Sequence, residues 1–543
     1  MLRIDNIKTE PGASEALLRQ RAATILRLPE GELTGFRVLR RSVDAREGVR
    51  LVWSVAVSVK NEASALRRCR NKNVSRYVPA VYTLPQAVNP PRLRPVVVGA
   101  GPAGLFCALV LAKCGARPIV LERGKRVEER RRDVETFWKT GRLDPASNVQ
   151  FGEGGAGAFS DGKYNITNDF GGTLYEHIGK REALELMRYV DSVNMAYGGE
   201  GTKLYSTAGT RFKKLCIENK LNLLDASVRH LGTDINYIVL KNLFAHLKDS
   251  VDFFFDTPVL DVCAEESGFA VCTEKGDYTC DKLIVSVGRS GSKWMESICK
   301  RLDIPTHSNR VDLGVRVELP AVVFSHLTDE LYESKIVYRT EKFEDNVRTF
   351  CMNPNGIVVT ENTNGIVTVN GHSYEREDMH TENTNFALLV SKHFTEPFND
   401  SNLYGESIAR LSNMLAGGVM VQRFGDLVRG RRSTVKRIEK GLVTPTLAAT
   451  PGDLSLVLPK RILDGIIEMI YALDKIAPGT ANDDTLLYGV EVKFYNMEVS
   501  LDDNLMTRYP GLYIIGDGSG ITHSLSHASA SGVFVARRIA EGM

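Results

Sequence analysis

The sequence lacks any apolar run long enough to cross a membrane. A spanning helix needs about 18 consecutive apolar residues, and no segment of the 543-residue chain reaches that length. The first residues, Met1-Leu2-Arg3-Ile4-Asp5-Asn6, contain no apolar stretch of signal-peptide length either. We therefore expect no membrane partner.

Charge surplus and paired cysteines are also missing. The 69 basic and 66 acidic residues leave a formal charge of +3, which argues against a nucleic-acid partner. The nine cysteines form no C-x-x-C pair and have no spacing with histidine that is typical of zinc. No metal is expected. Free thiols suit a reducing compartment, which predicts a cytoplasmic protein. The oligomeric state stays open.

The chain is longer than one hydrophobic core normally serves, so several folding units are expected. Residues 1–84 predict a small N-terminal α+β module. Its strand, helix and two further strands, at 2–7, 14–28, 35–42 and 49–59, have the order of a ferredoxin-like fold. The basic stretch 60–76 is interpreted as a solvated connector, with a partner-binding surface as the alternative. Pro85, Pro90, Pro91 and Pro95 then predict a linker.

A glycine motif follows this linker. Gly99-Ala100-Gly101-Pro102-Ala103-Gly104 lies between a short strand at 95–98 and an apolar helix at 103–114, and a second strand ends in Glu122. In a dinucleotide-binding βαβ unit the three glycines allow a tight turn, close approach of a pyrophosphate and close helix–strand packing. The helix N-terminus offers N–H groups to the phosphates. Glu122, about 20 residues on, is placed to accept hydrogen bonds from ribose hydroxyls.

Two distant segments favour FAD over NAD. Residues 280–288 predict a strand that ends in a turn of small residues, and residues 510–518 predict a strand that closes on Gly516-Asp517. A helix is expected at 527–539. In flavoproteins of this plan the aspartate binds the ribityl chain, and the N-terminus of the following helix stabilises negative charge on the reduced flavin. The order of the three segments therefore predicts a flavoprotein.

The glycine-rich segment 148–163 resembles a signature of the uncharacterised FAD-dependent dehydrogenase family. The resemblance extends through residues 121–124, 230–234, 288–291, 422–426, 516–522 and 528–532. It implies an α/β architecture with a Rossmann-like, discontinuous FAD-binding domain at 92–311 and 485–543, related to glutathione-reductase-type and aminoacetone-oxidase-like flavoproteins. It also implies an inserted α+β substrate domain at 312–484. Histidines occupy 523 and 527, where arginine and glutamine are expected in relatives.

The motifs and the resemblance together predict the residues that hold FAD. They are Gly99, Gly101, Pro102, Ala103, Gly104, Glu122, Arg123, Gln150, Gly154, Gly155, Ala156, Ser160, Asp161, Gly162, Lys163, Val259, Ser286, Gly288, Gly516, Asp517 and Ser524.

The inserted domain is expected to close over the flavin and to hold the substrate. Its pattern predicts strands at 315–319, 336–340, 357–360 and 366–369 and helices at 384–392 and 462–472. Its candidate polar groups are Arg316, Asn370, His372, Tyr374, Gln422 and Arg423.

His523 and His527 are the candidate catalytic residues. A histidine after the Gly-Asp motif could donate or accept a proton near the flavin at a pKa suited to neutral pH. Capping the helix, or hydrogen-bonding a flavin carbonyl, is the alternative role.

These features predict an enzyme, an FAD-dependent oxidoreductase that transfers a hydride through flavin N5 to or from a small organic substrate. Apart from the match at 152–157 within the glycine-rich segment, no second G-x-G-x-x-G is present, so NADH or NADPH is expected only as a transient electron donor. The direction of electron flow stays open. A flavin monooxygenase or halogenase is one alternative, although the Gly-Asp motif lacks their alanine pair and proline. A non-catalytic FAD-binding redox sensor is another.

Overall fold

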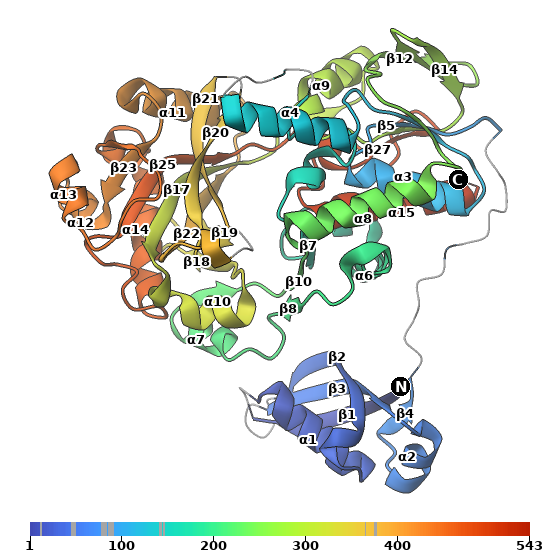
Figure 1. Cartoon of the computed structure of the whole chain (residues 1–543), viewed down its shortest axis with the longest axis horizontal. Coiled ribbons are helices and arrows are strands. Elements are labelled where there is room, and N and C mark those ends of the chain that lie inside the picture. Colours follow the sequence, from blue (N-terminus) through green and yellow to red (C-terminus); the bar gives the residue numbers. More distant parts are fainter. Residues whose placement is uncertain are drawn as a thin grey trace. The chain divides into compact units, whose positions relative to one another are not determined.

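The computed structural model describes residues 1–10, 13–44, 50–77, 84, 92–140, 144, 147–363, 365–373 and 377–542. The chain divides into two compact units (Figure 1). One comprises Met1–Tyr82 and Thr207–Leu223, and the other Thr83–Ser206 and Leu224–Met543. Three prolines of the predicted linker, Pro85, Pro90 and Pro91, lie outside the described residues.

The smaller unit has the predicted ferredoxin-like topology. Its antiparallel sheet has the order β2-β3-β1-β4, and two helices complete the β-α-β-β-α-β pattern. The elements are β1 (Leu2–Thr9), α1 (Glu15–Leu26), β2 (Leu33–Asp44), β3 (Arg50–Val59), α2 (Glu62–Cys69) and β4 (Val74–Arg76). The segment Thr207–Leu223, with α7 (Phe212–Glu218) and β9 (Leu221–Leu223), belongs to the same unit.

The interpretation of residues 60–76 as a connector is wrong. Helix α2 buries Ala65 and Cys69 in the core of the module, and β4 pairs with β1 along the sheet edge. The arginines that made the stretch look solvated lie on the outer side of α2 and β4, so their charge concealed a short amphipathic helix.

A parallel sheet forms the centre of the larger unit and confirms the predicted Rossmann-like fold. Its order is β11-β6-β5-β15-β27, and every neighbouring pair is parallel. The strands are β5 (Val96–Val98), β6 (Ile119–Leu121), β11 (Asp252–Phe254), β15 (Leu283–Val285) and β27 (Leu512–Ile514). The most C-terminal strand thus pairs beside strands from residues 96–285, as a discontinuous domain requires.

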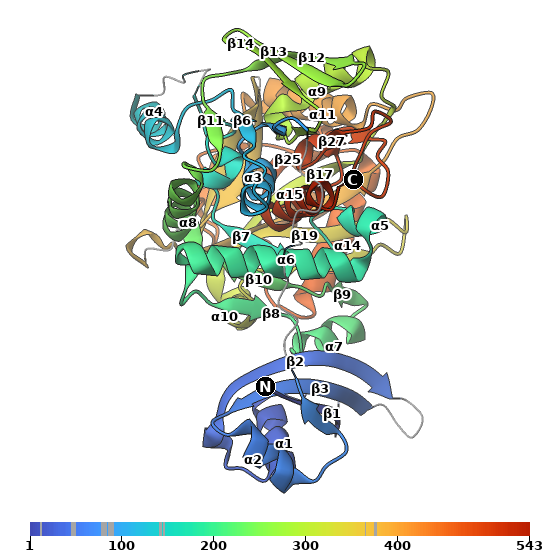
Figure 2. The same cartoon turned by 90° about the vertical axis from the view of Figure 1, so that its right-hand side faces the viewer.

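Two helices from opposite ends of this domain pack side by side. Helix α3 (Pro102–Lys113) follows β5, and α15 (Leu525–Ala540) follows β27 (Figure 1 and Figure 2). A Cβ on Gly532 would lie 2.1 Å from the carbonyl oxygen of Ala103. The two helices therefore approach each other at backbone distance, which brings the first and third predicted FAD motifs together.

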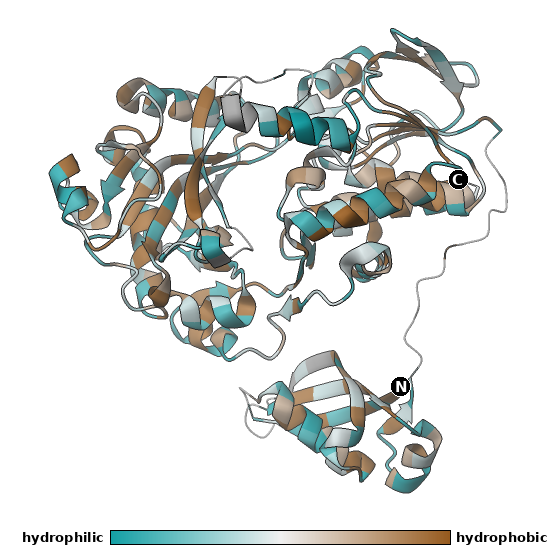
Figure 3. Ribbon diagram, viewed as in Figure 1, coloured by the Kyte–Doolittle hydropathy of each residue, from teal (hydrophilic) through white to brown (hydrophobic). Residues whose placement is uncertain are grey.

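Smaller elements surround the parallel sheet. They are α4 (Val127–Thr140), β7 (Lys163–Ile166), α5 (Leu174–Ile178), α6 (Lys180–Asn194), β8 (Leu204–Ser206), β10 (Ser227–His230), α8 (Gly232–Leu247), β12 (Val259–Glu265), β13 (Gly268–Thr273), β14 (Gly276–Cys280), α9 (Ser292–Arg301), β16 (Thr306–His307) and β26 (Glu498–Val499). Figure 3 shows α4 as largely hydrophilic, yet its Arg130 is fully buried.

The inserted region is built on a second, larger sheet. Within the larger unit its strands follow the order β24-β23-β25-β17-β22-β19-β18. They are β17 (Val311–Pro320), β18 (Ile336–Arg339), β19 (Asn346–Asn353), β22 (Asn383–Lys392), β23 (Met420–Arg423), β24 (Thr450–Pro451) and β25 (Leu486–Lys493). A hairpin of β20 (Ile357–Thr363) and β21 (Ile366–His372), with α10 (Ser325–Leu331), α11 (Ser401–Ala416), α12 (Phe424–Val428), α13 (Val435–Glu439) and α14 (Lys460–Asp474), completes the region.

The helix predicted at 384–392 is a strand. This segment is the buried core of β22, which pairs with β17 on one side and β19 on the other. A short apolar run has no periodicity that separates a buried strand from a buried helix, and here two neighbouring strands decide. The helix predicted at 462–472 is present as α14.

The inserted region was expected to end at residue 484, which lies just before β25. That strand pairs with β17 and β23 of the inserted sheet, so the sheet runs to Lys493. Among the described residues, no helix combines the length and hydrophobicity needed to span a bilayer.

Candidate functional site

The glycines of the turn after β5 are needed for two different reasons. Gly99 has a φ of 105°, and a Cβ on Gly104 would lie 2.0 Å from the carbonyl oxygen of Gly99. The protein itself requires glycine at both positions. Gly101 differs, because its φ is −75° and the nearest atom to an added Cβ is 3.9 Å away. The fold thus leaves the space beside Gly101 open. A ligand that approaches the backbone closely needs such a space.

Helix α3 begins at this space. Gly101 is its N-cap residue, Pro102 occupies the first turn, and no side chain caps the helix. The N–H groups of a first helical turn have no partners within the helix and carry the positive end of the helix dipole. The open space and the uncapped helix end together fit a pyrophosphate.

Glu122 ties three loops together. Its carboxylate accepts hydrogen bonds from the backbone N–H groups of Ala100 at 2.8 Å, Gly124 at 2.9 Å and Gly152 at 3.0 Å. A carboxylate has about four acceptor positions, so one is left for a ribose hydroxyl. Glu122 therefore organises the loops, while its contact with the adenosine ribose stays a prediction.

The glycine-rich segment lies directly on the first glycine turn. Gly154 N–H donates to the carbonyl of Ala100 at 2.9 Å, and a Cβ on Gly155 would lie 2.9 Å from the Cα of Gly101. Ala156 is exposed on this loop. We call residues 99–104 with residues 148–163 the nucleotide cradle. Two segments about 50 residues apart thus form one backbone surface.

Arg130 was not anticipated from the sequence. Its guanidinium is fully buried and donates to the backbone carbonyls of Asn148 at 3.0 Å, Glu153 at 2.5 Å and Gly155 at 3.0 Å. It therefore holds the glycine-rich segment in shape from α4. One arginine among several in a charged helix gives no signal that it alone points inward.

Glu153 supports the same segment from the other side. Its carboxylate accepts a hydrogen bond from Val127 N–H at the start of α4, at 3.1 Å. Burial raises the pKa of Glu153 to about 7, although the Val127 hydrogen bond and nearby arginines oppose the shift. This carboxyl therefore titrates close to neutral pH.

The other predicted residues of the adenosine half lie along the rim of the cradle. The Arg123 guanidinium carbon lies 3.8 Å from the centre of the Phe151 ring. Burial lowers the pKa of Arg123. Gln150 is exposed, and its N–H donates to Asn148. Val259 is partly buried and packs against the hydrophobic core beside β5 and β15, so its contact with FAD stays a prediction.

Ser160 and Gly162 shape the end of the glycine-rich segment. The Ser160 hydroxyl donates to the carbonyl of Gly157 at 2.9 Å and accepts from Gly162 N–H at 3.2 Å. Ser286 acts similarly on the first turn, where its hydroxyl lies 2.9 Å from the carbonyl oxygens of Val98 and Gly99. Both serines hold turns of the cradle in place.

Asp161 and Lys163 lead into a buried charged cluster. The Lys163 ammonium lies 2.8 Å from Asp161 and 3.6 Å from Glu333, and Lys335 lies 3.1 Å from Glu333. Burial alone would raise the pKa of Glu333, but the two lysines lower it to about 2. Tyr332, with a φ of 59°, stacks on His230 beside this cluster. Lys163 thus links the cradle to the inserted region, while its predicted contact with FAD stays a prediction.

The third motif packs against the start of α3. A Cβ on Gly516 would lie 3.0 Å from the Cβ of Ala103. Burial raises the pKa of the Asp517 carboxyl, which lies 3.4 Å from Nε of Arg289. Arg289 directly follows Gly288, so the turn after β15 faces the Gly-Asp motif. The three predicted FAD segments therefore meet in one place.

His523 and His527 lie beyond this meeting point. The Ser524 hydroxyl is the N-cap of α15 and lies 2.8 Å from Nδ1 of His527. Burial lowers the pKa of His527 to about 4. Burial, together with Arg289 and Arg310, lowers the pKa of His523 to about 3. This differs from the expected pKa near neutrality, so both imidazoles are neutral at pH 7.

Residues at the two junctions between the FAD-binding region and the inserted region lie next to His523. The Tyr495 ring meets the imidazole edge-on at 4.6 Å, and the Arg310 guanidinium lies 4.9 Å from the centre of the same ring. The Tyr495 hydroxyl donates to Asp312 at 2.5 Å, and Arg348 pairs with Asp312. We call these five residues, His523, Tyr495, Arg310, Asp312 and Arg348, the His523 wall. The sequence placed only His523 here.

Most of the polar groups proposed from the inserted region have structural partners. Arg316 is fully buried, forms two 2.8 Å contacts with Glu491 and donates to Asn370. The Gln422 amide donates to the carbonyl of Arg431 and accepts a hydrogen bond from the N–H of Leu454. Arg423 forms an ion pair with Asp484. Burial lowers the pKa of His372, which the charges of Asp161 and Lys163 also influence. Tyr374 lies outside the described residues.

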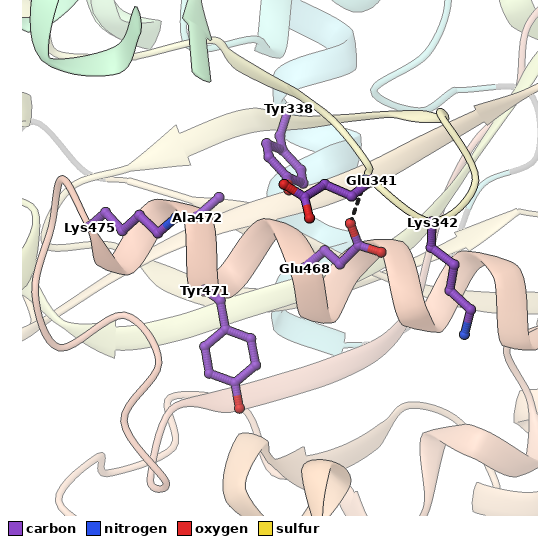
Figure 4. Close-up of a pocket in the computed structure, with 7 residues that line it drawn as sticks. All are labelled: Tyr338, Glu341, Lys342, Glu468, Tyr471, Ala472 and Lys475. Atoms are coloured by element: carbon purple, nitrogen blue, oxygen red, sulfur yellow. Dashed lines mark hydrogen bonds between the residues drawn. The ribbon is translucent and has the colours of Figure 1, made fainter. Parts of the chain in front are cut away.

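A hollow on the inserted region is unrelated to these motifs (Figure 4). It lies along α14, and the Glu341 N–H donates to the Glu468 carboxylate across it at 2.7 Å. Neither the cradle nor the His523 wall contributes to its lining. Among the described residues, no group of three or more metal-ligating side chains is present.

The cofactor is identified by comparison with protein families. Residues 94–276 match the family model described as an FAD binding domain, and residues 312–494 match that of an FAD-dependent protein, C-terminal domain-like. The chain therefore contains an FAD-binding domain. Its N-terminal residues 1–60 match a domain of unknown function, DUF8436. The nucleotide cradle fits FAD, because it leaves room at Gly101 and directs a free helix end toward that space.

The similar proteins match over most of the chain. An uncharacterised protein from Clostridium beijerinckii is 29% identical, and the match covers 99% of this chain and 98% of the relative. Glycine oxidase from Geobacillus kaustophilus is 11% identical with a TM-score of 0.35, covering 82% of this chain and 93% of that one. L-proline dehydrogenase from P. horikoshii is 14% identical with a TM-score of 0.32, covering 83% and 94%.

Proposed function

We propose that this FAD-dependent oxidoreductase exchanges a hydride with a small organic substrate held between the FAD-binding region and the inserted region. The observation that carries the proposal is the His523 wall. It joins the residue that follows the third FAD motif to side chains at the edge of the inserted sheet. A substrate bound there would contact both regions at once.

The chain holds the cofactor through the nucleotide cradle and the Gly-Asp motif. The open space at Gly101 and the start of α3 receive the phosphates, Glu122 faces the adenosine ribose, and Asp517 binds the ribityl chain. The other residues predicted to hold FAD support this binding through the turns they form. When bound, FAD supplies a ring that accepts or releases a hydride at N5.

His523 is the proposed catalytic residue. Because burial and the two arginines lower its pKa to about 3, the neutral imidazole accepts a proton or donates a hydrogen bond at pH 7. His527 is bonded to Ser524 at the start of α15, which favours a positioning role. NADH or NADPH is the proposed transient electron donor, since only the G-x-G-x-x-G at 99–104 lies between a strand and a helix, and the match at 152–157 belongs to the glycine-rich segment.

The proposal is tested with the purified holoprotein. NADH and NADPH are added under anaerobic conditions while flavin absorbance is followed, and the reduced protein is then mixed with a panel of organic oxidants and with oxygen. We expect His523→Ala to retain FAD but to turn over at least tenfold more slowly, the scale typical of lost acid–base catalysis. His246→Ala, at an exposed position of α8, serves as the matched control.

Each result decides between the candidates. Unchanged turnover in His523→Ala would remove that residue from the mechanism. Hydroxylated product with oxygen consumption would indicate a monooxygenase. A flavin that reduces and reoxidises without converting any substrate would indicate a redox sensor.

A further inference from the structure

The positively charged side chain of Arg310 forms no ion pair with any described residue. It precedes β17, and its guanidinium lies over the Tyr495 ring at 4.9 Å. Its Nε atom is buried and makes no hydrogen bond to any described residue. Within the described part of the chain, no carboxylate is found within ion-pair distance of it. A half-buried guanidinium with an unbonded N–H is unusual, because burying such a group without a partner is costly.

The nearby carboxylates are already engaged. Asp312 pairs with Arg348 and accepts hydrogen bonds from the hydroxyls of Tyr495 and Ser391. Asp517 lies 3.4 Å from Arg289. Two carboxylates therefore face three arginines, and Arg310 supplies the excess positive charge of the His523 wall.

The pKa of His523 indicates the sign of the electrostatic potential around it. After burial, Arg289 and Arg310 are the next causes that lower its pKa, whereas Asp312 opposes them. The imidazole stays neutral and adds no charge of its own. A ligand next to His523 therefore meets a positive potential, which favours an anion.

We propose that the substrate of this oxidoreductase carries an oxyanion, a carboxylate or a phosphate, which Arg310 binds beside His523. The inference rests on the proposed function and names the substrate class. The planar guanidinium matches two oxygens of either group in a bidentate pair. The anion would neutralise the excess charge and place the rest of the substrate against His523.

The experiment uses the oxidised holoprotein and needs no turnover. Benzoate, acetate and inorganic phosphate are titrated at constant ionic strength while the visible flavin spectrum is followed, and benzamide serves as the neutral counterpart of benzoate. We expect at least one anion to change the spectrum. Its Kd should rise about tenfold or more in Arg310→Gln, the effect of losing a hydrogen bond to a charged group.

Two further variants make the result specific. Arg310→Lys keeps the charge but loses the bidentate geometry, so an intermediate Kd is expected. Arg410→Gln removes an exposed arginine of α11 and should leave the Kd unchanged. A larger effect on benzoate and acetate than on phosphate would identify a carboxylate substrate, and the reverse would identify a phosphate.

The proposal is overturned if none of the three anions changes the spectrum, or if benzamide binds as tightly as benzoate. It is equally overturned if Arg310→Gln lowers FAD content while anion binding is unchanged, because Arg310 would then serve the cofactor. These outcomes are distinct from failure of the proposed function, which appears as absent turnover in a protein that still binds anions.

Discussion

The nucleotide cradle is made mainly of backbone atoms, whereas the His523 wall is made of side chains. In the cradle, amides of Ala100, Gly124 and Gly152 converge on one carboxylate, and glycines allow loops to touch. In the wall, ionisable and aromatic groups from 310–348, 495 and 523 meet. A backbone surface suits a cofactor common to many enzymes, while a side-chain surface can be adapted to one substrate.

The largest effect is expected from Gly104→Ala. The new Cβ would lie 2.0 Å from the carbonyl oxygen of Gly99, so α3 must move away from β5. We expect a loss of about 3 kcal/mol or more in the free energy of unfolding, together with loss of FAD. Chemical denaturation and the ratio of flavin to protein absorbance measure the two effects.

Gly101→Ala is the control that sharpens this result. No atom lies closer than 3.9 Å to its added Cβ, so the apoprotein should lose about 1 kcal/mol at most, the usual difference between glycine and alanine at an N-cap. FAD content should nevertheless fall. Full FAD content in Gly101→Ala would contradict the placement of the pyrophosphate.

Arg130→Met tests whether the cradle depends on a side chain after all. The change leaves the carbonyls of Asn148, Glu153 and Gly155 without their buried donor. We expect a loss of about 3 kcal/mol in unfolding free energy and weaker FAD binding. Arg131→Met, whose exposed side chain pairs with Glu135 on the same helix, should cost less than about 0.5 kcal/mol. Equal effects of the two variants would show that Arg130 has no special role.

Glu153→Gln is expected to change the pH dependence of stability. The folded pKa of about 7 lies above the ordinary value of 4.5, so the folded state holds a proton that the unfolded chain has released. The stability this confers is present below about pH 4.5 and is lost as pH rises through 7. Between pH 5 and pH 8 the wild type should lose about 2 kcal/mol from this group.

The variant should lack this part of the pH dependence, because glutamine does not titrate. The unfolding free energy of both proteins at pH 5 and pH 8 provides the measurement. Parallel pH profiles would exclude Glu153 as a titrating support of the cradle.

The cradle was largely predictable because its residues are close in sequence. The spacing of Gly99, Gly101 and Gly104 within a strand–turn–helix pattern indicates a dinucleotide site without any tertiary information. Arg130 escaped prediction because burial of one arginine depends on how α4 packs. The strand β22 was mistaken for a helix because its neighbours β17 and β19, which define it, come from other parts of the chain.

By itself, the sequence determined the cofactor and the Rossmann-like fold, since both follow from local patterns of glycine, apolar residues and one acidic residue. Only the tertiary structure decided the charge of the His523 wall. The sequence marked His523 as a residue that titrates near neutrality, but burial and two arginines from distant segments lower its pKa to about 3. A pKa reflects every charge and every buried surface around a group, and the folded chain alone brings these together.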